Sequence, residues 1–186
     1  MRYDQIRPIL AQKKPKVSVE IGTHKGKRAQ MIAHYSGMYY GFDLWEMGDE
    51  ANDRVEYNGK GRSTRKEAGE RLKGYPHELI QGFTQETLPE FVKRGIQVDF
   101  AFVDGGHAKD TIASDWAYLR QILAPGAVVV FDDYYLPESP LYGCNDVVRP
   151  LPHVLLPDTD TTQDGWKCHL VKVEWSATPV AERMAA

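Results

Sequence analysis

The chain has 186 residues, the length of one domain (residues 1–186) with room for a sizeable core. Hydrophobic residues make up 42% of it and charged residues 26%, a composition typical of soluble globular proteins. A formal net charge of −3 excludes a broad electrostatic attraction to nucleic acid or to an anionic membrane surface.

The first predicted elements are a helix, a strand and a second helix. In the N-terminal segment 1–16, residues 2–16 predict a short helix, whose apolar side consists of Ile6, Ile9 and Leu10. Residues 17–21 alternate like a strand that breaks at Gly22, and a helix-compatible run follows Gly26. Glycine at position 22 permits a sharp turn where a Cβ would clash. Glycine at position 26 would let a ligand approach the first helical turn, whose free N–H groups favour negative groups.

Two familiar phosphate-binding motifs fail at this loop. The dinucleotide fingerprint needs three glycines, and the phosphate loop needs one more residue and a magnesium-binding hydroxyl after the lysine. The pattern Glu20-x-Gly22-x-x-x-Gly26 instead resembles the first motif of class I S-adenosylmethionine (SAM)-dependent methyltransferases. That resemblance implies that Glu20 helps to hold the methionine ammonium group and that Gly22 makes room for the cofactor. The alternative is an ordinary strand–turn–helix.

A second short strand over residues 39–43 ends in Asp43, which lies 23 residues after Glu20. In wound α/β folds an acid at about this separation meets the ribose diol of a bound nucleoside. Nicotinamide proteins and SAM proteins share this arrangement, so Asp43 indicates an adenosine ligand without choosing between them. A solvated acid at a strand end is the alternative.

The segment 46–74 is polar and rich in charges, and it is a candidate lid or substrate-facing insertion. Thr64 and Glu67 could form a capping box that opens a helix through Leu72; a solvated surface helix is the alternative reading. A third strand follows over 77–82, and a further helix over 85–94. In the methyltransferase pattern the residues just beyond this strand, here Phe83 and Thr84, lie at the edge of the adenine.

Two apolar strands come next, over residues 98–104 and 127–131, and both are of the kind that is buried on two faces. The helix between them is expected to place four apolar residues on one face and to end at Pro125-Gly126; these residues are Ile112, Trp116, Leu119 and Leu123. Residues 153–156 and 168–175 are candidate final strands, and residues 177–186 are expected to form a loose tail.

Alternation of strands and helices predicts an α/β fold, a doubly wound and mainly parallel sheet with helices on both faces. Ligands in such sheets bind at the carboxyl ends of the strands. Most of the polar candidate residues fall at that edge: Gly22, Asp43, Thr84, Asp104, Asp132 and Asp133.

Three of these residues are acids that close neighbouring strands: Asp104, Asp132 and Asp133. Carboxylates brought together repel one another unless they are protonated or bridged by a cation. Oxygen ligands of this kind suit magnesium, calcium or manganese. In the alternative reading, one acid caps the following helix and another is solvated.

The two stretches that contain these acids, 102–107 and 123–134, carry the most selective resemblance. They resemble the small-molecule O-methyltransferase branch of class I, and most closely methyltransferase family 24, over residues 17–135 in motif order. The resemblance implies a Rossmann-like seven-stranded sheet and SAM as cofactor. In metal-dependent members the positions of Asp104, Asp132 and Asp133 hold Mg²⁺ or another divalent cation, and Asp104 also lies beside the cofactor.

His107 lies three residues beyond Asp104, an offset at which catechol-type enzymes carry a lysine that acts as the base. An imidazole with its ordinary pKa could deprotonate a hydroxyl group at neutral pH. We therefore expect His107 and Asp104 to be catalytic. A metal ligand, a cofactor contact and a helix cap are the alternatives for His107.

The expected function is methyl transfer from SAM to a small-molecule acceptor, at a hydroxyl oxygen. A non-catalytic SAM-binding module and a nicotinamide-dependent oxidoreductase are the rivals. Nucleic acid is not the expected acceptor, because no Asn-Pro-Pro-Tyr or Asp-Pro-Pro-Tyr motif is present. With no apolar run near the roughly 20 residues of a membrane span and only two cysteines, we expect a reduced cytoplasmic protein that forms no membrane contact. A disulfide between the two cysteines and a homodimer are both compatible with the sequence.

Overall fold

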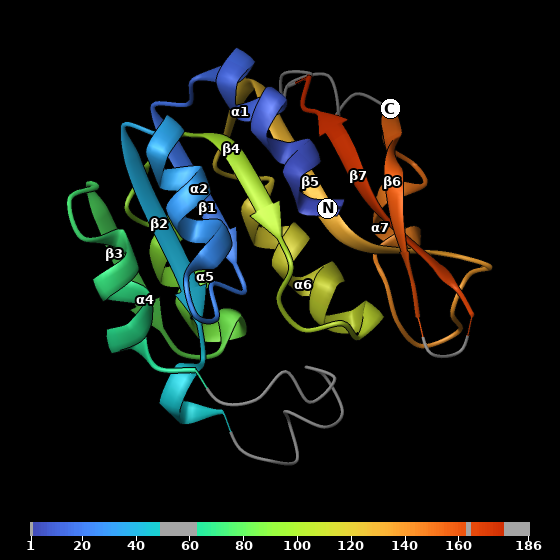
Figure 1. Ribbon diagram of the computed structural model, residues 1–186, viewed down its shortest axis with the longest axis horizontal. Helices are drawn as coiled ribbons and strands as arrows, with labels where there is room; N and C mark the ends of the chain where they lie inside the picture. The colour runs from blue at the N-terminus through green and yellow to red at the C-terminus, as the bar shows by residue number, and fades with distance from the viewer. Residues whose placement is uncertain (1, 49–62, 163–164, 177–186) are drawn as a thin grey trace.

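The computed structural model describes residues 2–48, 63–162 and 165–176. Its centre is a seven-stranded sheet of order β3-β2-β1-β4-β5-β7-β6, in which only β7 runs antiparallel to its neighbours (Figure 1). This arrangement confirms the predicted doubly wound, mainly parallel fold. The strands are β1 (Val17–Ile21), β2 (Met38–Asp43), β3 (His77–Gln81), β4 (Val98–Val103), β5 (Leu123–Leu136), β6 (His153–Thr161) and β7 (Lys167–Glu174).

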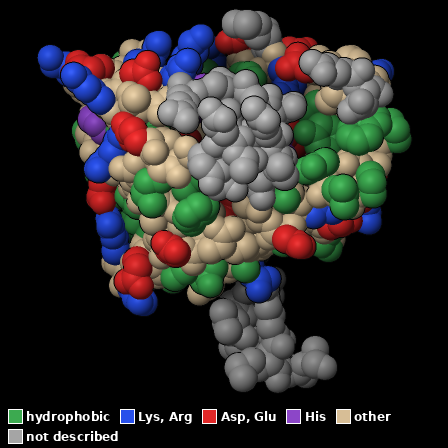
Figure 2. All heavy atoms as spheres, turned by 90° about the horizontal axis from the view of Figure 1, so that it is seen from below, with side chains coloured by type: hydrophobic (Ala, Val, Ile, Leu, Met, Phe, Trp, Pro, Cys, Tyr) green, Lys and Arg blue, Asp and Glu red, His purple; other side chains and the backbone are tan. Residues whose placement is uncertain are grey.

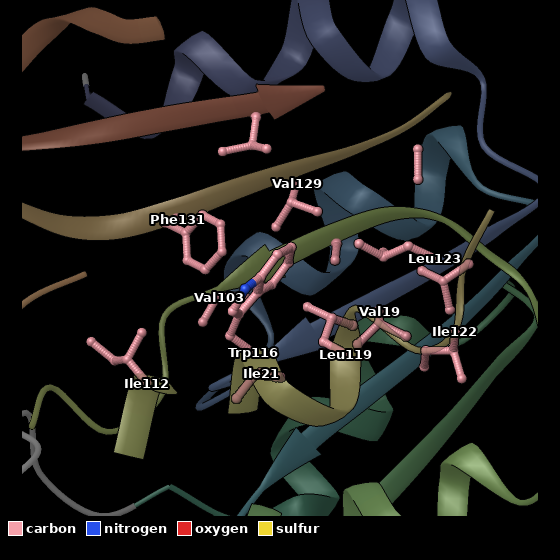
Figure 3. Packing of buried hydrophobic residues seen from close by; sticks show 14 of the residues in the cluster. Val19, Ile21, Val103, Ile112, Trp116, Leu119, Ile122, Leu123, Val129 and Phe131 are labelled. Carbon is pink, nitrogen blue, oxygen red and sulfur yellow. The ribbon is translucent and has the colours of Figure 1, made fainter. Parts of the chain in front are cut away.

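Helices cover both faces of the sheet and bury two separate apolar layers. The helical elements are η1 (Arg2–Gln5), α1 (Ile6–Lys13), α2 (Lys27–Tyr35), η2 (Trp45–Met47), α4 (Arg65–Leu72), α5 (Thr84–Val92), α6 (Lys109–Leu119) and α7 (Asn145–Val148). On one face α1, α2 and α4 pack against residues such as Phe100 and Phe102. On the other face α5 and α6 cover Val19, Ile21 and Phe131, with Trp116 of α6 set against the strands (Figure 3).

The parallel strands end at one edge of the sheet, which lies at the bottom of Figure 1. The register pairs Ile21 of β1 with Val103 of β4, and Val103 with Phe131 of β5. The residues that directly follow these strands therefore meet at this carboxyl edge, as the sequence predicts.

Capping chemistry accounts for the start of α4. Thr64 Oγ1 accepts a hydrogen bond from the backbone N–H of Glu67, and the Glu67 carboxylate accepts one from the backbone N–H of Thr64. This is the predicted capping box. The rest of the candidate lid, residues 49–62, and the expected C-terminal tail, residues 177–186, lie outside the described residues.

The structure corrects two predictions about the segment between β4 and β5. Helix α6 ends at Leu119, so neither Pro125 nor Gly126 terminates it, and Leu123 begins β5 where it pairs with Val98. Leu123 nevertheless packs in the same apolar cluster as α6, because the turn after the helix returns the chain to the sheet. Leu123 lies four residues after Leu119, the spacing of one helical turn, although it belongs to a strand.

Strands β5 and β6 are longer than predicted, because β7 pairs with both of them beyond the apolar stretches. Cys144 and Cys168 are both buried and are not joined by a disulfide. No helix among the described residues combines the length and the apolar character needed to cross a membrane.

Candidate active site

The turn after β1 forms the floor of a pocket at the carboxyl edge. Gly22 has a φ of +91°, and a Cβ built on it would lie 1.8 Å from the carbonyl oxygen of Asp104. Only glycine can therefore bring β1 this close to the end of β4. The pocket is lined by Ile21, Gly22, Phe42, Asp43, Leu44, Gly82, Phe83, Thr84, Gln85, Gly105, Gly106 and Thr111.

Asp43 organises one wall of this pocket. Its carboxylate accepts hydrogen bonds from the backbone N–H groups of His24, at 2.7 Å, and Trp45, at 2.8 Å. Both donors belong to residues with positive φ, +49° for His24 and +43° for Trp45, a backbone conformation that residues other than glycine rarely adopt. Burial raises the pKa of Asp43, while these N–H groups oppose the rise. An acid with acceptor capacity left on each oxygen thus faces the pocket.

Phe83 and Thr84 lie at the mouth of the pocket, where β3 passes into α5. The ring of Phe83 is 40% exposed although it is large and apolar, which leaves a flat surface available to a planar ligand. The structure thus places Gly22, Asp43, Phe83 and Thr84 around one cavity. Gly26 faces elsewhere: a Cβ on it would lie 3.1 Å from Ala68 Cα, so close packing of α2 against α4 accounts for this glycine.

Glu20 is completely buried behind the pocket. One carboxylate oxygen accepts a hydrogen bond from the Tyr39 hydroxyl, and the other lies 3.7 Å from Nε of Arg28. Neither that second oxygen nor Arg28 Nε has a hydrogen-bond partner among the described residues. Burial raises the pKa of Glu20 to about 8, against the opposing effects of Arg28 and Tyr39.

The three acids of the predicted metal site divide between two clusters. Asp104, His107 and Asp133 each place one ligand atom within 4.8 Å of the others, whereas Asp132 groups with Asp133 and Cys168. Asp104 forms an ion pair with Arg28, and Asp132 forms one with Arg2. Sequence reasoning did not find these two arginines. Arg28, in the first turn of α2, could have been inferred from its position beside the glycine loop.

His107 and Asp133 face each other, with His107 Nε2 3.6 Å from Asp133 Oδ2. The Tyr135 hydroxyl donates to the other Asp133 oxygen at 2.8 Å and so fixes the carboxylate. His107 is 9% exposed, and its buried Nε2 has no hydrogen-bond partner among the described residues. The backbone carbonyls of both residues accept N–H groups from the 143–144 turn, which holds the pair in register.

Figure 2 looks onto this edge of the molecule. Lysine and arginine side chains gather on the side of β3, and hydrophobic side chains gather on the side of β5 and β7. The exposed Leu136 ends β5, and the exposed Leu141 lies in the segment that follows it. The backbone of Leu141 is tied to the start of α6, because its carbonyl accepts the Lys109 N–H at 3.1 Å. The chain beyond β5 thus places an exposed leucine close in space to the loop that carries His107.

Comparison with known proteins gives one family. The model of methyltransferase family 24, described as "Methyltransferase domain", matches residues 19–134. No curated protein matches the sequence.

Solved structures share the fold at low sequence identity. The O-methyltransferase TomG from Streptomyces achromogenes, involved in tomaymycin synthesis and solved in complex with SAM, is 17% identical with a TM-score of 0.68, covering 94% of this chain and 79% of its own. An O-methyltransferase from Bacillus cereus, solved with SAH, is 13% identical with a TM-score of 0.65, covering 93% and 80%. An rRNA methylase from Streptococcus thermophilus is 16% identical with a TM-score of 0.66, covering 95% and 98%.

Proposed function

Because this chain belongs to methyltransferase family 24 of the class I SAM-dependent methyltransferases, we propose that it methylates a hydroxyl oxygen of a small-molecule acceptor. The observation that carries this proposal is the continuity of the carboxyl edge. The pocket lined by Gly22, Asp43 and Phe83 is also lined by Gly105 and Gly106, and His107 is the next residue of that loop. A cofactor pocket and a proton-accepting group thus share one loop.

The pocket fits the adenosine part of SAM. Asp43 would accept the ribose hydroxyls with its remaining lone pairs, as an acid at the end of the second strand does in wound α/β folds. Phe83 would offer its exposed ring to the adenine, and Thr84 would lie at the adenine edge. Gly22 and Gly105 would contribute indirectly, because their missing side chains let β1 and the end of β4 come together at the base of the pocket.

The methionine end of SAM would lie toward Glu20, Arg28 and Asp104. The buried Glu20 oxygen and Arg28 Nε, both without a hydrogen-bond partner among the described residues, are a site that an ammonium and a carboxylate group would complete. Cofactor binding would have to shift the Nε side of Arg28 away from Glu20, since Glu20 is closed off from solvent, while Nη2 of Arg28 would stay with Asp104. We therefore expect the side chain of Arg28 to differ between the free and the bound protein.

When bound, SAM supplies an electrophilic methyl carbon: the S–CH₃ bond breaks as the O–CH₃ bond forms, leaving SAH. The acceptor hydroxyl must lose its proton in this reaction, and His107 would take it. Asp133 would stabilise the resulting imidazolium, and Tyr135 would hold Asp133 in position. Exact positioning of acceptor and cofactor would supply most of the rate.

The acceptor would be a small molecule with an apolar body. Leu136 and Leu141 would contact that body beside His107. Acceptors differ in class among structures with this fold, which include an rRNA methylase. Assistance by a divalent cation is a separate prediction. The acids that it would need belong to two clusters that share Asp133, and two of these acids pair with arginines.

A binding titration and a turnover assay test the proposal. SAH should bind the purified protein in calorimetry and raise its melting temperature, whereas NAD should do neither. Incubation with SAM and a panel of hydroxylated aromatic and aliphatic acceptors should then release SAH. Binding of SAH without turnover on any acceptor, amines and RNA included, would favour a non-catalytic SAM-binding module. Preferential binding of NAD would favour an oxidoreductase.

Replacing Asp43 by alanine should weaken SAH binding by about tenfold or more, because charge-assisted hydrogen bonds to the ribose are lost. Calorimetry measures this change. The matched control is Asp99→Ala at the opposite edge of the sheet, where the carboxylate also accepts two backbone N–H groups, from Lys16 and Val17. Both variants should lose stability, but only the first should lose affinity. Equal losses of affinity would contradict the ribose role.

Replacing His107 by glutamine should lower turnover by about 10²-fold, because the general base is lost. SAH affinity should stay within about twofold of the unchanged protein, since His107 lies beyond the adenosine pocket. Single-turnover kinetics at saturating SAM measures the first effect. His34→Gln, an exposed histidine on α2, is the control. Full activity of His107→Gln would exclude the histidine as base.

A further inference from the structure

A charge network of three acids and two arginines lies on the α1–α2 face of the carboxyl edge. Glu20 lies beside Phe102 in the register of β1 with β4, and Phe102 lies beside Val130 of β5. Because side chains alternate along a strand, Asp104 and Asp132, two residues further on, are directed to the same face as Glu20. The helices of this face bring Arg28 from α2 and Arg2 from η1 to these acids.

The carboxylate of Asp132 is surrounded by hydrogen-bond donors, two of which come from Arg2. The two Nη atoms of Arg2 donate to the two carboxylate oxygens, with Nη2 3.1 Å from Oδ2. The Tyr3 hydroxyl donates to Oδ2 at 2.7 Å, and the backbone N–H of Asp133 donates to Oδ1 at 2.7 Å. A carboxylate has about four lone-pair positions, and four donors already face this one. No position is left for a metal ion unless Arg2 moves away.

The guanidinium group of Arg2 is itself held from several sides. Its Nε lies 2.9 Å from Asp160 Oδ2 at the end of β6, and its Nη1 lies 2.6 Å from Cys168 Sγ of β7. The side chain is only 8% exposed. Planar, bidentate pairing of this kind is the arrangement in which arginine cannot be replaced by a simple point charge.

Tyr3 joins the two arginines. The guanidinium carbon of Arg2 lies 4.8 Å from the centre of the Tyr3 ring, and that of Arg28 lies 4.6 Å from it. Arg28 in turn forms the ion pair with Asp104. Two of the three acids of the predicted metal site, Asp104 and Asp132, are thus already matched by positive side chains that contact one aromatic ring.

From this network we propose that Arg2 and Arg28 take the place of the divalent cation, and that methyl transfer in this protein proceeds without a metal. Arg2 is then a positioning residue that holds Asp132, and the N-terminal segment is part of the active-site edge. The statement about metal binding is independent of the proposed function; the statement about metal-free turnover rests on it.

The test measures Mn²⁺ binding by electron paramagnetic resonance, together with SAH binding and turnover. The unchanged protein should show no saturable Mn²⁺ binding up to 1 mM, a limit on the order of the weakest specific Ca²⁺ sites of proteins. Turnover with SAM should be the same with and without EDTA. Arg2→Met should free Asp132 and raise Mn²⁺ affinity at least tenfold, and adding Asp132→Asn should abolish that gain.

Two further variants keep the outcome interpretable. Arg7→Met removes an exposed arginine from α1 and should leave Mn²⁺ binding unchanged. Arg2→Lys keeps the positive charge but loses the bidentate contact, so it serves if the methionine variant does not fold. Tight Mn²⁺ binding by the unchanged protein that is lost in Asp132→Asn or His107→Gln, or inactivation by EDTA, would overturn the proposal. SAH binding is measured separately. If the proposed function were wrong, the unchanged protein would not bind SAH, whatever its Mn²⁺ binding.

Discussion

Replacing Glu20 by glutamine is expected to weaken SAH binding while making the free protein more stable at pH 8. The reason is the position of the carboxyl group, which has no exposed surface and, among the described residues, accepts a hydrogen bond only from the Tyr39 hydroxyl. Burial raises its pKa from 4.5 to about 8, so in the free protein at neutral pH the proton stays on Glu20. Glutamine has nearly the shape of the protonated acid, and its side chain stays neutral at every pH considered.

The sign of the stability effect follows from proton counting. Between pH 4.5 and pH 8 the folded protein holds a proton on Glu20 that the unfolded chain has released, so the free energy of unfolding falls as the pH rises. The slope is at most about 1.4 kcal/mol per pH unit. Glu20→Gln removes this slope. The variant should therefore match the unchanged protein near pH 5 and exceed its stability at pH 8, by an upper bound of about 4 kcal/mol.

The binding effect has the opposite direction. Under the proposed function the methionine ammonium group favours the ionised carboxylate, so cofactor binding at pH 7 releases the proton from Glu20. Affinity should rise with pH up to about 8 and then level off. Glutamine loses the charge, and SAH should bind about 10- to 100-fold more weakly, the value of one charge-assisted hydrogen bond.

Urea unfolding at pH 5 and pH 8 measures the first effect, and calorimetry in buffers of different ionisation enthalpy measures proton release in the second. Glu78→Gln is the control, since Glu78 also faces an arginine, Arg94, but lies about half exposed. If the free energy of unfolding changed equally in Glu20→Gln and in the unchanged protein between pH 5 and pH 8, Glu20 would be ionised in the free protein. If Glu20→Gln released as many protons on SAH binding as the unchanged protein, Glu20 could not be the group that binds the ammonium.

The fold is predictable from the sequence because its signals are local. Residues 100–103 and 127–131 are continuous apolar runs, as is typical of strands buried on two faces, and the capping box at Thr64 has its two partners three residues apart. Parallel pairing then brings the ends of the strands together. The pocket of Gly22, Asp43, Phe83 and Thr84 follows from this geometry alone.

The partners of the acids are not predictable in this way. Arg2 and Asp132 are 130 residues apart in the sequence, and neither residue carries a local pattern that points to the other. Asp133 adopts a φ of +62° and lies beside His107, whereas Asp132 pairs with Arg2. Sequence reasoning treats the two neighbouring acids as one pair of ligands. In the structure one ligand atom of each still lies within 4.8 Å of the other, but their charged partners differ.

Replacing Gly22 by alanine is expected to be the most destabilising single change at this edge. The added Cβ would lie 1.8 Å from the Asp104 carbonyl oxygen and 2.9 Å from Gly105 Cα, and both obstacles are backbone that cannot rotate away. Relief would require β4 to separate from β1, breaking the hydrogen bond of 2.9 Å from the Asp104 N–H to the Ile21 carbonyl. A loss of about 4 kcal/mol or more is expected, in the range that marks a severe local clash.

The left-handed backbone contributes only part of that loss, and Gly74 separates the two causes. Gly74 has nearly the same φ, +93° against +91°, but no atom of the described part of the chain lies within 4 Å of a Cβ built on it. Gly74→Ala should therefore cost only the conformational penalty of about 1 to 2 kcal/mol, as measured by urea unfolding. Gly22→Ala should lose SAH binding as well, because Asp104, Gly105 and Gly106 move together. If both alanine variants unfolded at the same urea concentration, close contact between β1 and the end of β4 could not be what requires glycine at position 22.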